Sequence, residues 1–102
     1  MKISIEEYRA SVKALLPLAL GDTGGSRIAA LVLLSAYNSH AWRLPIVSLS
    51  ILDNKNYAHA LNVIRGRVEL GTEPHELIPD GGQQFEELSD IWKSEKHRAA
   101  EE

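Results

Sequence analysis

The sequence predicts an all-α fold: a single-domain bundle of four to five helices with a central apolar helix, formed by residues 1–102. Apolar residues recur every three or four positions along several segments, as they do in helices that bury one face. Glycine, proline, aspartate and asparagine gather between those segments and indicate turns. With 102 residues, 44% of them hydrophobic and 25% charged, the chain suits one folded domain with one core.

The first helix is predicted to begin after Ser4 and to run to about Leu20. Ser4 and Glu7 fit a capping box, in which side chains satisfy free backbone N–H groups at the start of a helix. Pro17 removes one backbone donor and is expected to kink the last turn. Gly21 is expected to close the helix in the left-handed conformation. The residues that share the inward stripe are Ile5, Tyr8, Val12, Leu15, Leu16 and Ala19.

The second helix is expected at the centre of the bundle. Residues 27–37 are apolar on nearly every face, which is typical of a buried helix. Asp22 or Thr23 can cap its N-terminus, because both side chains accept hydrogen bonds from free backbone N–H groups. Residues 38–45 are expected to form a loop, and residues 46–52 a short, partly buried helix.

A third helix is predicted from a cap at Asp53 or Asn54 to about Leu70, where Gly71 ends it. A solvated outer face is the simpler interpretation of its polar side, although that side could also bind an acidic partner. The apolar stripe expected to face inward comprises Tyr57, Leu61, Ile64 and Val68. The opposite, polar stripe comprises Lys55, His59 and Asn62, with Arg65 and Arg67 beside it.

The C-terminal part is predicted to hold one ordered loop and one helix. Residues 72–82 contain prolines and glycines around a single helical turn, whose Leu77 and Ile78 are expected to enter the core. The last helix begins near Gly82, with acidic residues early and basic residues late, an order that complements the helix dipole. After Lys93 the apolar stripe ends and the tail is expected to fray. The residues expected to face inward are Phe85, Leu88 and Trp92.

Residues 21–27, Gly-Asp-Thr-Gly-Gly-Ser-Arg, form the most informative motif and admit more than one interpretation. Asp22-Thr23-Gly24 matches the Asp-Thr-Gly of homodimeric aspartic proteases, whose chemistry needs two carboxylates that share a proton across a two-fold axis. Those proteases are built almost entirely of strands, whereas this motif lies between segments of helical period. We therefore favour a turn between two helices, and a dimeric aspartic hydrolase using Asp22 is the enzyme alternative.

The same turn could bind an anion. Backbone N–H groups of Gly24, Gly25 and Ser26 begin the second helix, and Arg27 lies beside them. The motif lacks the Gly-Lys-Ser/Thr ending of a nucleotide-binding loop. Helix capping is therefore the favoured interpretation.

No cofactor, metal or catalytic residue is predicted. The chain has no cysteine, which excludes disulfides, thiolate zinc sites and a cysteine nucleophile. His75-Glu76 begins a His-Glu-x-x-His zinc pattern, but Pro79 stands where the second histidine is required. The formal net charge of −3 offers no long-range attraction to phosphate, so nucleic-acid binding is not favoured. A small DNA-binding regulator that uses the third helix is kept as an alternative.

A cytoplasmic protein without a membrane segment is expected. The longest apolar stretch, residues 28–37, is shorter than the roughly 20 residues that span a bilayer. Acidic residues, Glu6 and Glu7, stand where a signal peptide would carry its apolar segment.

The motif at residues 21–27, the apolar helix that ends at Tyr37, a short segment at residues 49–53 and a closing Phe85, Leu88 and Trp92 resemble an uncharacterised family of small bacterial proteins. Members of that family carry a Gly-Asp-Thr-Gly-x-Ser-Arg motif and are found on plasmids, phage-like elements and integrative elements. Gly25 stands where the family has glutamine. The resemblance implies an accessory protein of a mobile element and supplies no activity.

These inferences favour a protein-binding accessory protein that is not an enzyme. Its partner would be a host protein complex, such as a CRISPR antiviral defence complex that it inhibits, because small acidic helical domains often act by occupying a basic surface. The contact could be carried by exposed acids, Glu86, Glu87 and Asp90, or by the turn with Asp22, Thr23 and Arg27. An apolar group could be core or homodimer interface: Trp42, Ile46, Val47 and Leu49.

Overall fold

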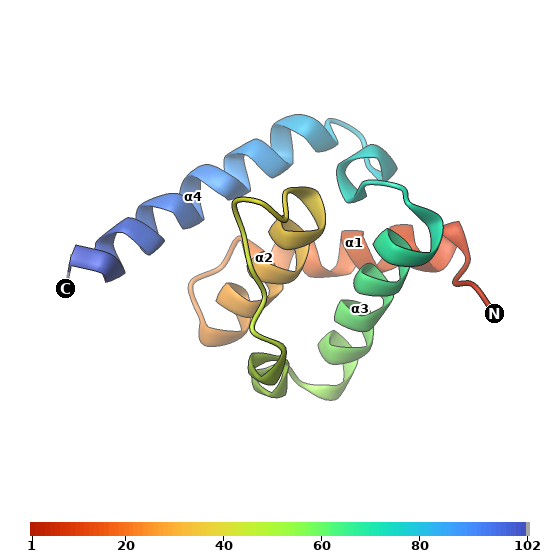
Figure 1. The fold of residues 1–102 in the computed structure, drawn as a ribbon, viewed down its shortest axis with the longest axis horizontal. Coiled ribbons are helices and arrows are strands. Elements are labelled where there is room, and N and C mark those ends of the chain that lie inside the picture. The colour runs from red at the N-terminus through yellow and green to blue at the C-terminus, as the bar shows by residue number, and fades with distance from the viewer. Residues whose placement is uncertain (102) are drawn as a thin grey trace.

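The computed structural model describes the backbone of residues 1–101 and the side chains of residues 1–94. It contains α1 (Ile5–Ala19), α2 (Gly24–Tyr37), α3 (Asn54–Arg65) and α4 (Gly81–Glu101), as Figure 1 shows. Short segments connect them: the 3-10 helix η1 (Ile46–Ile51), the π-helical turn η2 (Gly66–Leu70) and the 3-10 helix η3 (Pro74–Leu77). Residues 1–101 include no strand, and the predicted all-α class is confirmed.

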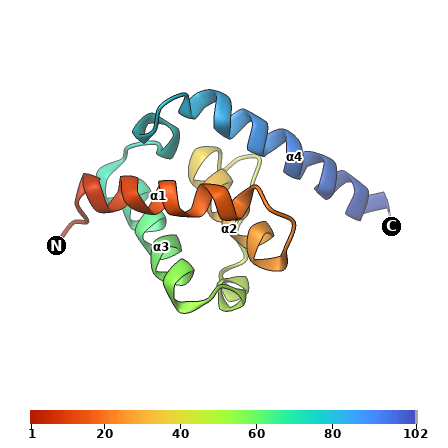
Figure 2. The ribbon, with the colours of Figure 1, turned by 180° about the vertical axis from the view of Figure 1, so that it is seen from behind.

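Helix α2 occupies the centre of the bundle, as its sequence predicts. It contacts α1, α3 and α4 together with η1 and η3. Seen from behind in Figure 2, α1 crosses in front of α2 and α3. The apolar side chains that α2 buries are Ile28, Ala29, Ala30, Val32, Leu33 and Leu34. None of the helices in the described part of the chain combines the length and the apolar character needed to cross a membrane.

Helix α1 begins and packs as its pattern predicts. The Ser4 hydroxyl oxygen accepts a hydrogen bond from the Glu7 backbone N–H at 3.1 Å, which caps the helix. The predicted stripe is buried except for Ile5, which is half-buried. Gly21 does not adopt the left-handed conformation that we expected. Leu20 ends the helix with right-handed geometry, and Gly21 is required for space, because a Cβ there would lie 2.7 Å from the Ser26 hydroxyl oxygen.

Helix α3 is rotated relative to the prediction. Tyr57 and Leu61 of α3, and Val68 of η2, were expected inside, yet they are 42%, 37% and 77% exposed. Ile64 is partly buried against the core, as predicted. The buried residues are instead the smaller Ala60 and Val63. Two members of the expected polar stripe, His59 and Asn62, face α1, where the buried Ser11 hydroxyl needs partners, whereas Lys55 is exposed.

Those partners come from the polar stripe of α3. The Ser11 hydroxyl oxygen lies 2.9 Å from His59 Nδ1, and the Asn62 side-chain amide donates to it at 3.1 Å. An exposed serine beside a histidine would suggest a nucleophile. Ser11 is only 1% exposed, so this network joins two helices and is closed to a substrate.

The N-terminal end of α1 packs against η2 around Tyr8. The Tyr8 side chain is fully buried, and its hydroxyl donates to the Thr72 carbonyl at 2.7 Å. Gly66 lies directly against the Tyr8 ring, where a larger residue would overlap it. Gly71 ends this part of the chain, as predicted, and adopts the left-handed conformation at φ 71°.

Stability is expected to fall above about pH 10 because Tyr8 must stay protonated in the fold. Burial raises the pKa of Tyr8 from 10.0 to about 12. Since the folded state keeps the proton to higher pH than the unfolded state, this stabilisation is complete below pH 10.0 and is lost as the pH rises through about 12. Denaturant unfolding at a series of alkaline pH values measures the slope.

The control for this titration is Tyr8→Phe, which cannot ionise at that position. Its unfolding free energy should be lower at neutral pH, because the hydrogen bond to Thr72 is lost, and should decline less steeply in alkali than that of the wild type. Equal slopes for the two proteins would contradict the assignment.

The C-terminal segments pack largely as predicted. Helix α4 begins at Gly81, one residue earlier than expected, and buries Phe85 and Leu88. Trp92 is half-buried, and its indole N–H donates to the Ala19 carbonyl at 3.0 Å, which ties α4 to the end of α1. The helix continues to Glu101, past Lys93, where the sequence predicted fraying. The predicted helical turn is η3, with Leu77 buried and Ile78 half-buried.

Candidate functional site

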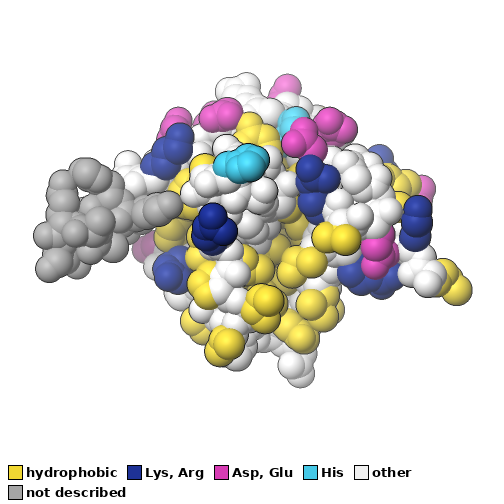
Figure 3. Space-filling view, viewed as in Figure 1, with side chains coloured by type: hydrophobic (Ala, Val, Ile, Leu, Met, Phe, Trp, Pro, Cys, Tyr) yellow, Lys and Arg dark blue, Asp and Glu magenta, His cyan; other side chains and the backbone are white. Residues whose placement is uncertain are grey.

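Figure 3 shows two surfaces of different character on one face of the molecule. Acidic side chains gather along its upper edge, over η3 and the N-terminal half of α4. Hydrophobic side chains gather along its lower edge, over η1 and α3. Sequence reasoning anticipated the first surface and only part of the second.

The acidic ridge, defined as Glu86, Glu87 and Asp90, lies on the exposed side of α4. Glu86 accepts a hydrogen bond from the Tyr37 hydroxyl at 2.7 Å, and Glu87 accepts one from the Gln83 side-chain amide at 3.3 Å. Among the side chains of residues 1–94, no lysine or arginine lies within ion-pair distance of these carboxylates. The ridge carboxylates therefore have no direct ion-pair partner in the described part of the chain, and Lys93, three positions after Asp90, is the next cation along α4.

Other acids extend this negative surface toward η3. The hydrogen bond to Glu86 raises the pKa of the Tyr37 hydroxyl, and burial and the charges of Glu86 and Glu73 raise it further. Glu73, His75 and Glu76 place their potential ligand atoms within 4.8 Å of one another, an arrangement that could hold a metal ion. His75 Nε2 lies 3.9 Å from a Glu73 carboxylate oxygen. In the sequence, His75 was compared only with the His-Glu-x-x-His zinc motif, and this cluster was not predicted.

The apolar patch, defined as Ile46, Val47, Ile51, Tyr57 and Leu61, covers adjacent parts of η1 and α3. These residues are 77%, 85%, 55%, 42% and 37% exposed. A shallow pocket of about 380 Å³ lies within the patch. Two members of the predicted core-or-interface group belong to the patch, Ile46 and Val47, whereas Leu49 and Trp42 are buried in the core.

The turn between α1 and α2 is a helix cap. The Thr23 hydroxyl oxygen, and not the Asp22 carboxylate, caps α2 by accepting a hydrogen bond from the Ser26 backbone N–H at 3.0 Å. Arg27 donates its backbone N–H to the Thr23 carbonyl at 3.1 Å. The capping interpretation is confirmed for Thr23, and the N–H of Ser26 is engaged within the turn.

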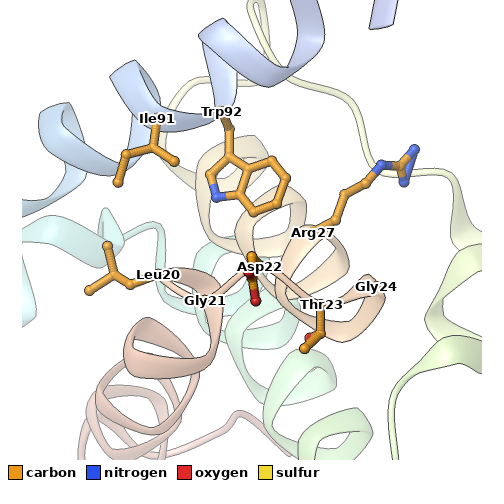
Figure 4. A pocket seen from close by; sticks show the side chains of 8 residues that line it. All are labelled: Leu20, Gly21, Asp22, Thr23, Gly24, Arg27, Ile91 and Trp92. Carbon is orange, nitrogen blue, oxygen red and sulfur yellow. The ribbon is translucent and has the colours of Figure 1, made fainter. Parts of the chain in front are cut away.

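The turn also forms one wall of an open pocket of about 620 Å³. The opposite wall comes from α4, which contributes Ile91 and Trp92 (Figure 4). The candidate residues Asp22, Thr23 and Arg27 thus line one pocket, and Figure 4 shows the Arg27 guanidinium pointing away from Asp22. Asp90 of the acidic ridge directly precedes Ile91, so the ridge ends beside this pocket.

Two alternatives from the sequence, a dimeric aspartic hydrolase and a DNA-binding regulator, concern Asp22 and the polar side of α3. Among the residues whose side chains the structure describes, Asp22 is the one carboxylate that lines this pocket, and a dimeric aspartic hydrolase would take its second carboxylate from another copy of the chain. The polar stripe expected on α3 is divided: His59 and Asn62 bind Ser11, whereas Lys55 is exposed. Arg67 donates to the Ala36 and Gly71 carbonyls. Arg65 pairs with Glu69 at 2.9 Å.

A family of unknown function, DUF7673, matches residues 9–93 of the chain. The match includes the motif at residues 21–27 and all the acidic ridge. No curated protein and no solved structure matches the chain.

Proposed function

The chain belongs to DUF7673, a family of unknown function, and from its surfaces we propose that it is a binding protein without catalytic activity. It acts as an accessory protein of a mobile element and inhibits a host antiviral defence complex such as CRISPR. The acidic ridge is the observation that supports this proposal most directly. Its carboxylates stand on a rigid helix that packs on the core through Phe85 and Leu88.

The ridge suits a positively charged partner surface. Its carboxylates lie on the outer side of α4, because Glu86 and Glu87 precede Asp90 by four and three residues, the spacing of neighbours on a helix surface. A charged helix of this kind accelerates encounter with a surface of opposite charge and disfavours acidic partners. Defence complexes that bind nucleic acid carry basic grooves for phosphate, and an acidic helix can occupy such a groove in place of the nucleic acid.

The candidate catalytic groups do not favour an enzyme. Ser11 has a histidine beside it but lies in the core, out of reach of a substrate. Asp22 is open to solvent, and a catalytic pair would need a second carboxylate from another copy of the chain. A binding role requires neither group, only the exposed surface that the ridge provides.

The test is a plaque assay in bacteria whose CRISPR system restricts a phage. Wild-type protein should restore plaque formation, and the double variant Glu87→Lys, Asp90→Lys should not. Replacing these acids by lysine converts attraction into repulsion, so affinity for the purified defence complex should fall at least about tenfold. The wild-type affinity should also weaken as salt increases, because mobile ions screen exposed charges.

Two controls sharpen this test. Glu87→Gln, Asp90→Asn removes charge without reversing it and should give an intermediate affinity. Glu6→Lys introduces a lysine at an exposed position of α1 and should behave like the wild type. If the double lysine variant binds as tightly as the wild type, the ridge is not the contact surface. If the wild type fails to restore plaques against every defence system in a panel of strains, the proposed role is wrong.

A further inference from the structure

We propose that the apolar patch is the two-fold interface of a homodimer. This inference goes beyond the proposed function and uses a different surface. The patch combines the outward side of η1 with the outward stripe of α3. Ile46 and Val47, its most exposed members, are 77% and 85% accessible in the single chain.

The orientation of α3 in the bundle is the first argument that its outward side contacts another molecule. The exposed apolar residues at positions 57 and 61 are four residues apart and therefore lie on one face of α3, where they can pack against another protein surface. Within the chain, α3 instead turns its small and polar residues toward α1, where His59 and Asn62 satisfy the buried Ser11. The apolar stripe is left for a second contact, which a partner molecule can supply.

The distribution of charge favours a second copy as that partner. A two-fold interface brings a surface against itself, so a charged surface would meet like charge. The apolar patch contains no aspartate, glutamate, lysine, arginine or histidine. Figure 3 places the acidic side chains at the opposite edge, so the acidic ridges of two copies would point away from the shared interface. At its rim, Asp53 and Lys55 carry opposite charges that a two-fold axis can pair between copies.

The area of the patch also suits a dimer. If a fully exposed side chain offers roughly 150 Å², the exposed fractions of the patch correspond to about 450 Å² of apolar surface. A standard interface buries about 800 Å² on each partner, of which about 56–65% is apolar. The patch therefore supplies the apolar share of one side of such an interface.

Sedimentation velocity and light scattering over about 1 to 500 µM protein test the proposal, because this range brackets micromolar dissociation constants. The wild type should be a dimer at the upper end. Ile46→Glu and Val47→Glu, tested separately, should each raise the dimer dissociation constant at least about 100-fold, since the two-fold axis places each new charge in the interface twice. Circular dichroism should remain that of the wild type, because both positions are exposed.

The matched control is Ile91→Glu, an isoleucine that is 43% exposed on α4, outside the patch. This variant should dimerise like the wild type. A monomeric wild type throughout the range overturns the proposal, even if another protein or a lipid vesicle binds the patch. Dimers that persist in both patch variants overturn it as well. Neither result bears on the acidic ridge, which the plaque assay tests separately.

Discussion

Replacing Gly66 with alanine is expected to lower the free energy of unfolding by at least about 3 kcal/mol. A Cβ at this position would lie 2.2 Å from Tyr8 Cγ and 2.4 Å from both Cδ atoms. The ring cannot move aside, because it is fully buried and its hydroxyl is bound to the Thr72 carbonyl. Thermal unfolding followed by circular dichroism should show a fall in Tm of more than about 10 °C.

A double-mutant cycle separates this overlap from the general effect of alanine. Tyr8→Ala alone should destabilise the protein by about 3–5 kcal/mol through the cavity it leaves. The double variant Tyr8→Ala, Gly66→Ala should lose less unfolding free energy than the sum of the two single losses, since the truncated side chain leaves room for the new methyl group. Additive effects would show that Gly66 acts through something other than contact with Tyr8.

The order and type of the helices could be predicted from local signals. Ser4 with Glu7, and Thr23 with Ser26, satisfy backbone groups within four residues of each other, so their sequence spacing is sufficient. The stripe of α1 likewise depends only on spacing along one helix. These features require no knowledge of what lies across the core.

The orientation of α3 could not be predicted from its own pattern. Tyr57 and Leu61 indicate the wrong buried side, because the residue that decides the orientation of α3 is on another helix. Ser11 lies between Tyr8 and Val12 on the buried side of α1 and needs hydrogen-bond partners there. The Ser11 hydroxyl on an otherwise apolar stripe was the sign in the sequence that a polar partner must face α1. Its partners, His59 and Asn62, lie 48 and 51 residues away along the chain.

The candidate sites divide in the same way. The acidic ridge lies along a single helix and was predictable from the spacing of its three residues. The pocket beside Asp22 was not, because Trp92 reaches it through a hydrogen bond to Ala19 that spans 73 positions. The part of the apolar patch on α3 could not be predicted, because a hydrophobic stripe is expected to pack inside its own chain. A stripe that serves a second molecule has the same sequence pattern.

Gly81→Ala is expected to be at least as damaging as the change at Gly66, about 3 kcal/mol or more, because the new atom would meet backbone. A Cβ at Gly81 would lie 1.8 Å from the His75 carbonyl oxygen and 2.7 Å from its carbon. Relieving this overlap requires η3 to move away from α4. That movement would disturb the buried Leu77 and the contact of the His75 ring with Tyr37, whose centroids are 5.0 Å apart.

The neighbouring Gly82 provides the control, because a Cβ there would meet no atom within 4 Å. Gly82→Ala should leave the unfolding free energy unchanged or raise it by up to about 1 kcal/mol, as alanine favours the helical conformation. Chemical denaturation of both variants measures the contrast between two adjacent glycines at the start of one helix. Equal stabilities would mean that α4 does not need its close approach to η3, and that the acidic surface spanning η3 and α4 is not held as a rigid unit.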